Sequence, residues 1–74
     1  MIITLKVFAT LRQKYPNIQT LDVNHESTVA DIFNIINLNP ETVSIIMVNG
    51  ISVKIDHVLA ENDVMSLFPP VGGG

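Results

Sequence analysis

The fold is decided by the stretch Thr28-Val29-Ala30-Asp31-Ile32-Phe33-Asn34-Ile35-Ile36-Asn37. Its apolar residues recur at the i, i+3, i+4, i+7 spacing of a helix with one buried face. Thr28 is a typical helix-capping residue, and Asp31, three positions on, supplies the acid of a capping box. Asn37 and the following Asn39-Pro40 end the helix, because the residue before a proline is pushed out of the helical region. The stretch therefore predicts one helix of about three turns.

Two segments before this helix and three after it have the composition of strands, namely residues 1–8, 18–23, 43–48, 51–53 and 64–68. The first two alternate in polarity and predict an antiparallel hairpin. Residues 43–48 are almost continuously apolar and predict a strand buried in the middle of the core. Asn49-Gly50 is a strong signal for a tight hairpin between the third and fourth strands. The order β-β-α-β-β-β predicts an α+β domain of β-grasp architecture, with a mixed sheet of about five strands and one main helix packed across it.

Composition restricts the class of protein. A chain of 74 residues with 47% apolar residues has room for one small domain, which we assign to residues 1–71, followed by a flexible glycine tail at 72–74. The absence of cysteine excludes disulfides and thiolate metal ligands. Four basic residues and a net charge of −3 provide no basic stripe for nucleic acid. The chain shows no signal peptide and no apolar run of ~20 residues, so we expect a cytoplasmic protein without membrane contact.

The side chains offer little chemistry of their own. His25 and His57 are far apart in the sequence and have no carboxylate cluster at metal-ligand spacing, which argues against a metal site. Glu26-Ser27-Thr28 stands where a nucleotide-binding protein would have a glycine-rich loop, and Glu26 would repel phosphate. We therefore expect no tightly bound cofactor. The C-terminal carboxylate is the only distinctive reactive group.

The chain ends in Phe68-Pro69-Pro70-Val71-Gly72-Gly73-Gly74. The prolines predict a stiff, extended stem, whereas three glycines predict a mobile tip. The four residues Val71, Gly72, Gly73 and Gly74 reach at most roughly 13–14 Å, which is enough to enter a partner's pocket. A frayed terminus, or glycines left by cloning, is the alternative interpretation of the same residues.

A terminal carboxylate is a poor electrophile and has to be activated by another enzyme. Adenylation would give a mixed anhydride at Gly74, which sulfide or a persulfide could convert to a thiocarboxylate and a lysine to an amide. This chemistry implies ATP, magnesium and an adenylating partner. The chain itself would then not be an enzyme but a protein whose C-terminus another enzyme activates.

The alternation of residues also predicts a surface for the partner. If Ile3, Leu5 and Val7 face the helix, Phe8 and Phe68 fall on the opposite, open face of the sheet. An exposed aromatic pair beside the tail is a candidate docking surface. The alternative is that loops cover both rings.

Several motifs resemble the MoaD/ThiS sulfur-carrier proteins over nearly the whole chain. They are Phe8-Ala9-Thr10-Leu11-Arg12, Thr28-Val29-Ala30-Asp31, Val48-Asn49-Gly50, Glu61-Asn62-Asp63-Val64 and Phe68-Pro69-Pro70-Val71 before Gly73-Gly74. The resemblance implies the ubiquitin-like β-grasp fold and a C-terminal glycine, here Gly74, that is adenylated by a ubiquitin-activating-type enzyme (MoeB/ThiF-like) and then thiocarboxylated.

The tail looks more like that of MoaD, the small subunit of molybdopterin synthase, which donates sulfur in molybdenum cofactor biosynthesis. That resemblance implies a MoaE-like large subunit whose active site the tail enters through Pro69, Pro70, Val71, Gly72 and Gly73. It also implies that Phe8 and Phe68 contact the partner. Three alternatives stay open: a ThiS-like carrier for thiamine thiazole synthesis, a ubiquitin-like modifier joined to lysines, and a binding module with an inert tail.

Overall fold

The first two strands form the predicted antiparallel hairpin. In the computed structural model, which describes residues 1–70, they are β1 (Ile2–Val7) and β2 (Ile18–Asp22). Ile3 pairs with Leu21 and Leu5 pairs with Gln19. The alternation along β1 places Ile3, Leu5 and Val7 in the core, because successive side chains of a strand point to opposite faces.

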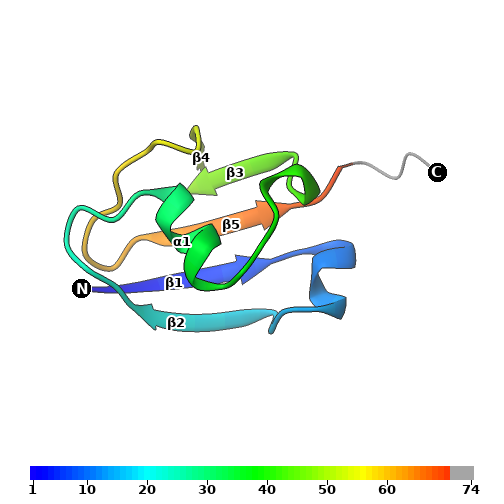
Figure 1. Ribbon diagram of the computed structural model, residues 1–74, viewed down its shortest axis with the longest axis horizontal. Helices are drawn as coiled ribbons and strands as arrows, with labels where there is room; N and C mark the ends of the chain where they lie inside the picture. The colour runs from blue at the N-terminus through cyan, green and yellow to red at the C-terminus, as the bar shows by residue number, and fades with distance from the viewer. Residues whose placement is uncertain (71–74) are drawn as a thin grey trace.

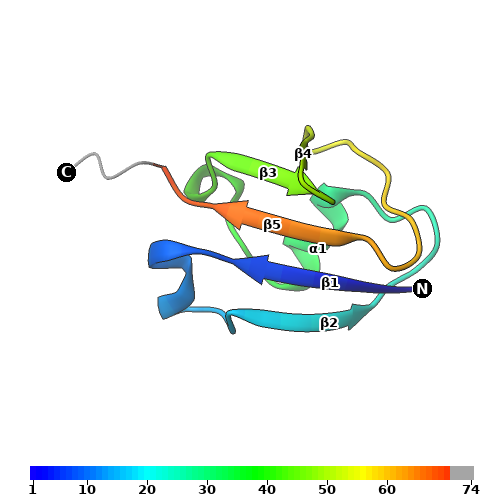
Figure 2. The same ribbon diagram turned by 180° about the vertical axis from the view of Figure 1, so that it is seen from behind.

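Three later strands complete a mixed sheet (Figures 1 and 2). They are β3 (Ile45–Val48), β4 (Ile51–Ser52) and β5 (Val64–Phe68). The strand order is β2-β1-β5-β3-β4, with β1 and β5 parallel and every other neighbouring pair antiparallel. The predicted fold class, an α+β β-grasp domain with five strands, is confirmed.

The hairpin between β3 and β4 turns at Asn49-Gly50, as predicted. Asn49 and Gly50 have φ angles of 53° and 81°, the two positive values of a two-residue hairpin turn that matches the twist of the strands. The Asn49 side chain accepts a hydrogen bond from the Val64 amide and donates one to the Asp63 carboxylate, each 2.9 Å long. The turn is thereby tied to the start of β5.

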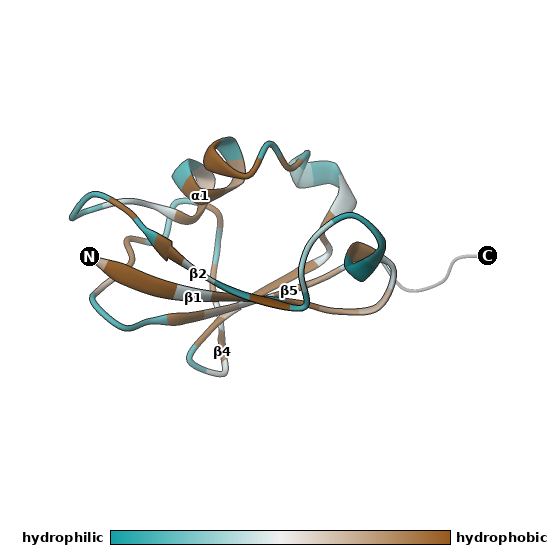
Figure 3. Ribbon diagram, turned by 90° about the horizontal axis from the view of Figure 1, so that it is seen from below, coloured by the Kyte–Doolittle hydropathy of each residue, from teal (hydrophilic) through white to brown (hydrophobic). Residues whose placement is uncertain are grey.

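The helix α1 (Val29–Ile35) lies across one face of the sheet, so the molecule has two layers (Figure 3). Its predicted capping box is present: the Asp31 amide donates to the Thr28 hydroxyl over 3.2 Å, and the Thr28 amide donates to the Asp31 carboxylate over 2.9 Å. The predicted length of about three turns was wrong, since α1 has seven residues. The chain leaves the helix early because Asn37 adopts a left-handed conformation with φ 57°, and the Leu38 amide bonds back to the Phe33 carbonyl at 2.8 Å.

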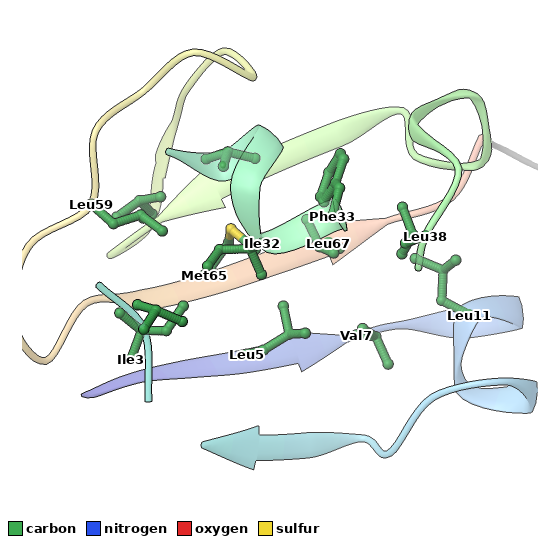
Figure 4. Packing of buried hydrophobic residues seen from close by; sticks show 13 residues of the cluster. Ile3, Leu5, Val7, Leu11, Ile32, Phe33, Leu38, Leu59, Met65 and Leu67 are labelled. Atoms are coloured by element: carbon green, nitrogen blue, oxygen red, sulfur yellow. The ribbon is translucent and has the colours of Figure 1, made fainter. Parts of the chain in front are cut away.

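The core fills the space between the helix and the sheet (Figure 4). The central strands β1 and β5 supply its floor, the helix supplies its cover, and the loops close its ends. Its buried members are Ile3, Leu5, Val7, Leu11, Val23, Val29, Ile32, Phe33, Leu38, Val48, Leu59, Met65 and Leu67. The side chains on one face of β1 and β5 pack into this core. The other face of the sheet is not covered by the helix, and we call it the open face.

The prediction that residues 43–48 are buried in the middle of the core was wrong. The strand begins at Ile45, and the central strand of the sheet is β5. Ile45 is 42% exposed and only Val48 is fully buried, because the helix covers one face of the sheet and the other face of β3 meets solvent. Two short 3-10 helices, η1 (Ala9–Gln13) and η2 (Pro40–Thr42), lie between the predicted strands and helix.

Candidate functional site

Phe8 and Phe68 lie together on the open face, at the end of the sheet where β5 gives way to the tail. Their rings stack with centroids 4.5 Å apart and planes inclined by 10°. Each ring is half-buried, and part of that burial comes from the other ring. Both aromatic residues therefore lie on the open face, as predicted, and neither ring is covered completely by a loop.

Backbone hydrogen bonds fix both rings in place. Phe8 follows Val7, whose partner in the parallel register is Leu67, and the Phe8 amide donates to the Leu67 carbonyl at 3.1 Å. Phe68 is held from its other side, since its carbonyl accepts from the Ser44 amide at 2.8 Å. The aromatic pair is thus part of the sheet framework and is ordered before any partner arrives, which lowers the entropy lost on binding.

Arg12 extends the aromatic stack by one more layer. Its guanidinium lies over the Phe8 ring, with Cζ 5.1 Å from the ring centroid, and its Nε donates to the Val7 carbonyl at 3.0 Å. This geometry is that of a cation–π contact. Nothing in the sequence predicted a role for Arg12, although it stands in the Phe8-Ala9-Thr10-Leu11-Arg12 motif. The order of the layers is Arg12, Phe8, Phe68, and we call these three residues the aromatic stack.

The open face continues from the stack across the neighbouring strands. Ile45 pairs with Phe68 in the register of β3 and β5, and it is 42% exposed. Lys6 and Met47 both pair with Ser66 and lie one row further from the tail. The stack and Ile45 form an apolar row at the edge of the face, and Lys6 adds a positive charge beside it.

A cleft of about 430 Å³ lies on the helix side of the tail root, which we define as Pro69 and Pro70. Both prolines line it, and the other walls come from η1, the turn after α1 and η2. The remaining lining residues are Thr10, Leu11, Gln13, Lys14, Tyr15, Asn37, Asn39 and Thr42. The Tyr15 hydroxyl donates to the Asn37 carbonyl at 3.3 Å and closes one side of the cleft. The tail root therefore has the aromatic stack on one side and this cleft on the other.

The other predicted tail residues, Val71, Gly72, Gly73 and Gly74, lie outside the described residues. Their roles in tail insertion and sulfur transfer stay predictions, as does the contact of Phe8 and Phe68 with a partner. Within residues 1–70, no helix has the length and apolar character needed to span a membrane. In the same part of the chain, no group of three or more His, Asp or Glu side chains could hold a metal ion.

The strand order and the single helix define a class of structure, the small ubiquitin-like β-grasp domain. The chain belongs to the ThiS family, which it matches over residues 5–74. That match begins in β1 and includes the whole C-terminal tail. No curated protein sequence matches the chain closely enough to count as a relative.

Solved structures resemble it along almost its full length. SAMP1, a small archaeal modifier protein from Haloferax volcanii, is 24% identical with a TM-score of 0.81, and the match covers 100% of both chains. A candidate molybdopterin converting factor, subunit 1, from Pyrococcus furiosus is 26% identical with a TM-score of 0.79, over 95% of this chain and 98% of that one. A chain from the complex of subunits 1 and 2 of molybdopterin-converting factor from Helicobacter pylori is 21% identical with a TM-score of 0.70, over 100% of both. These similarities confirm the β-grasp fold and the resemblance to MoaD.

Proposed function

We propose that this protein is a sulfur carrier whose C-terminal Gly74 is adenylated and thiocarboxylated, and that it donates sulfur as the small subunit of molybdopterin synthase. The observation that carries the proposal is the match to the ThiS family through residue 74, since the tail is the only part of the chain with distinctive reactivity. The similarity to the Pyrococcus furiosus protein supports the molybdopterin pathway in particular.

The chemistry requires two steps at one carbon atom. The Gly74 carboxylate attacks the α-phosphorus of ATP in the partner, releasing pyrophosphate and forming an acyl-adenylate. Hydrosulfide then attacks the activated carbonyl carbon and displaces AMP, which leaves a thiocarboxylate. Magnesium would serve the ATP in the activating enzyme, a MoeB/ThiF-like adenylyltransferase, and a MoaE-like large subunit would receive the sulfur.

The described residues contribute docking and orientation to this sequence of steps. The aromatic stack presents a pre-formed apolar surface beside the tail root, and buried aromatic anchors dominate the energetics of many interfaces. Phe8 and Phe68 would bind the partner while Pro69 and Pro70 direct the tail away from the sheet. Glycines at the tip would allow entry into a narrow channel, since they carry no Cβ.

Two variants of the tail test the carrier role. Removing Gly74, or adding one residue after it, should abolish sulfur transfer and leave the thermal unfolding midpoint unchanged, because the core lies within residues 1–70. Ile35→Ala is a control for an unrelated change, since this exposed residue of α1 is not among those that line the cleft at the tail root. Sulfur transfer that survives both tail changes would overturn the proposal.

The alternatives differ in the acceptor of the activated Gly74. A ThiS-like carrier would pass its sulfur to a thiazole-forming enzyme. The thiocarboxylated protein is therefore incubated in parallel with two acceptors, the molybdopterin synthase large subunit with its pterin precursor and thiazole synthase, and the loss of sulfur from Gly74 is compared. A ubiquitin-like modifier would leave glycine remnants on lysines in a digest of the host proteome. An inert tail predicts that removing residues 72–74 changes none of these readouts.

A further inference from the structure

The basic residues of this acidic protein are concentrated around the tail root. Three of its four basic side chains fall within residues 6–14: Lys6 near the end of β1, Arg12 in η1, and Lys14 at the C-cap of η1. The C-terminal end of β1 and the whole of η1 lie at the end of the sheet where β5 leads into the tail root (Figure 1). Of the seven acidic residues, only Glu41, in η2, belongs to an element that borders the tail root.

Acidic side chains are concentrated at the other end. Asp22 pairs with Ile2 at the start of β1, and the Glu61 carboxylate accepts a hydrogen bond from the Ile2 amide at 2.6 Å. Asp63 precedes β5 and bonds to Asn49. The chain therefore has a positive end that carries the tail and a negative end opposite to it. A separation of this kind orients a molecule in the field of a charged partner.

The three cations of the positive end are available to a partner. The only ion pair within residues 1–70 joins the Met1 ammonium to Asp22 at 3.6 Å. Arg12 uses Nε to bond the Val7 carbonyl and the face of its guanidinium to cover Phe8, and within residues 1–70 its terminal nitrogens form no hydrogen bond. A guanidinium fixed in this way is pre-organised to receive a carboxylate through two parallel hydrogen bonds.

Arg12 and Lys14 flank the tail root on different sides. Arg12 belongs to the aromatic stack on the open face, whereas Lys14 lines the cleft that Pro69 and Pro70 border on the helix side. We propose that the adenylating partner carries carboxylates on both sides of the entrance that admits the tail, one opposite Arg12 and one opposite Lys14. The ligand that fits this surface is a protein surface with both apolar and acidic side chains. Its carboxylates would pair with the single cations, and its apolar side chains would cover the aromatic stack. This inference rests on the proposed function, since it requires a partner that binds the tail.

Charge reversal at the two cations tests the proposal. The variants are Arg12→Glu and Lys14→Glu, and Lys54→Glu is the matched control because it makes the same change of charge at an exposed residue after β4. The association rate with the adenylating enzyme of the same organism is measured by stopped-flow at about 50 mM and about 500 mM KCl, since salt screens exposed charges over a Debye length of about 10 Å at 0.1 M.

Both test variants should associate on the order of tenfold more slowly than wild type at the low salt concentration, with the difference shrinking at high salt. Lys54→Glu should associate at the wild-type rate. A purely structural role for Arg12 would not produce this dependence on salt, and Lys14→Glu changes no hydrogen bond made by the lysine side chain within residues 1–70.

Two results would overturn the inference. Test variants that associate as fast as wild type at low salt, while wild type is thiocarboxylated at Gly74, would refute the acidic rim and leave the carrier role intact. A wild-type protein that neither binds the adenylating enzyme nor gains sulfur would refute the proposed function together with the inference built on it.

Discussion

The substitution Phe68→Ala tests whether the aromatic stack binds the partner, because it should weaken binding while the domain stays folded. The change removes one of two rings whose centroids are 4.5 Å apart, and it leaves one face of Phe8 without its stacking partner. Because the ring is half-buried, its removal forfeits half of the about 1.5–3 kcal/mol of a fully buried side chain. Loss of the aromatic pairing adds about 0.5–1.5 kcal/mol. The free energy of unfolding should therefore fall by about 2 kcal/mol.

A domain of this size should remain folded after such a change, because stabilities of about 5–15 kcal/mol are usual. The unfolding midpoint should fall by about 8–16 °C, measured by circular dichroism. The affinity for the adenylating partner should fall at least about 30-fold, which corresponds to the about 2 kcal/mol that defines an interface hot spot. Isothermal titration calorimetry below the lowered midpoint measures this affinity.

Ile35→Ala is the control for a general loss of apolar surface. Ile35 is 56% exposed and lies on α1, on the opposite layer of the molecule from the aromatic stack. It should leave the affinity for the partner unchanged. If Phe68→Ala stays folded and binds the partner as tightly as wild type does, the assignment of the open face as the docking surface is wrong.

Three further predictions concern the turn between β3 and β4 and the start of α1. Asn49→Ala should lower the free energy of unfolding by about 2 kcal/mol, measured by urea denaturation, because it removes the bonds to Val64 and Asp63. Gly50→Ala should destabilise by about 1 kcal/mol although a Cβ would meet nothing within 4 Å, since the φ of 81° alone disfavours alanine; an unchanged denaturation midpoint would contradict this. Thr28→Ala should lower the stability by about 1 kcal/mol through loss of the capping box, with Thr20→Ala, on an exposed strand position, as the comparison.

The sequence predicted which face of the sheet a side chain occupies more reliably than how deeply each strand is buried. Alternation in β1 and β5 assigned Phe8 and Phe68 to the open face, because the period of a strand leaves no other choice once Ile3 and Leu67 are in the core. A continuous apolar run such as residues 45–48 carries no such information. Its burial depends on how far the helix reaches across the sheet, which is set by tertiary packing.

The position of Arg12 could not be predicted from the sequence for a similar reason. Its guanidinium reaches the Phe8 ring only because Ala9 adopts a left-handed conformation with φ 53° and η1 then turns the chain back over the strand. Alanine rarely adopts this conformation, so the segment contains no sequence signal that predicts the turn. The early end of α1 depends in the same way on the left-handed Asn37, although asparagine is one of the residues that tolerate that conformation.

The central claim is that Gly74 carries sulfur, and one mass measurement tests it directly. The purified protein is incubated with the adenylating enzyme of its host, ATP, magnesium and a sulfur source, its intact mass is determined, and the C-terminal peptide is sequenced. We expect a mass gain equal to the replacement of one oxygen atom by sulfur, located at Gly74. An unchanged mass, obtained with an adenylating enzyme that is active on another carrier, would contradict the claim and favour the modifier or the inert binding module.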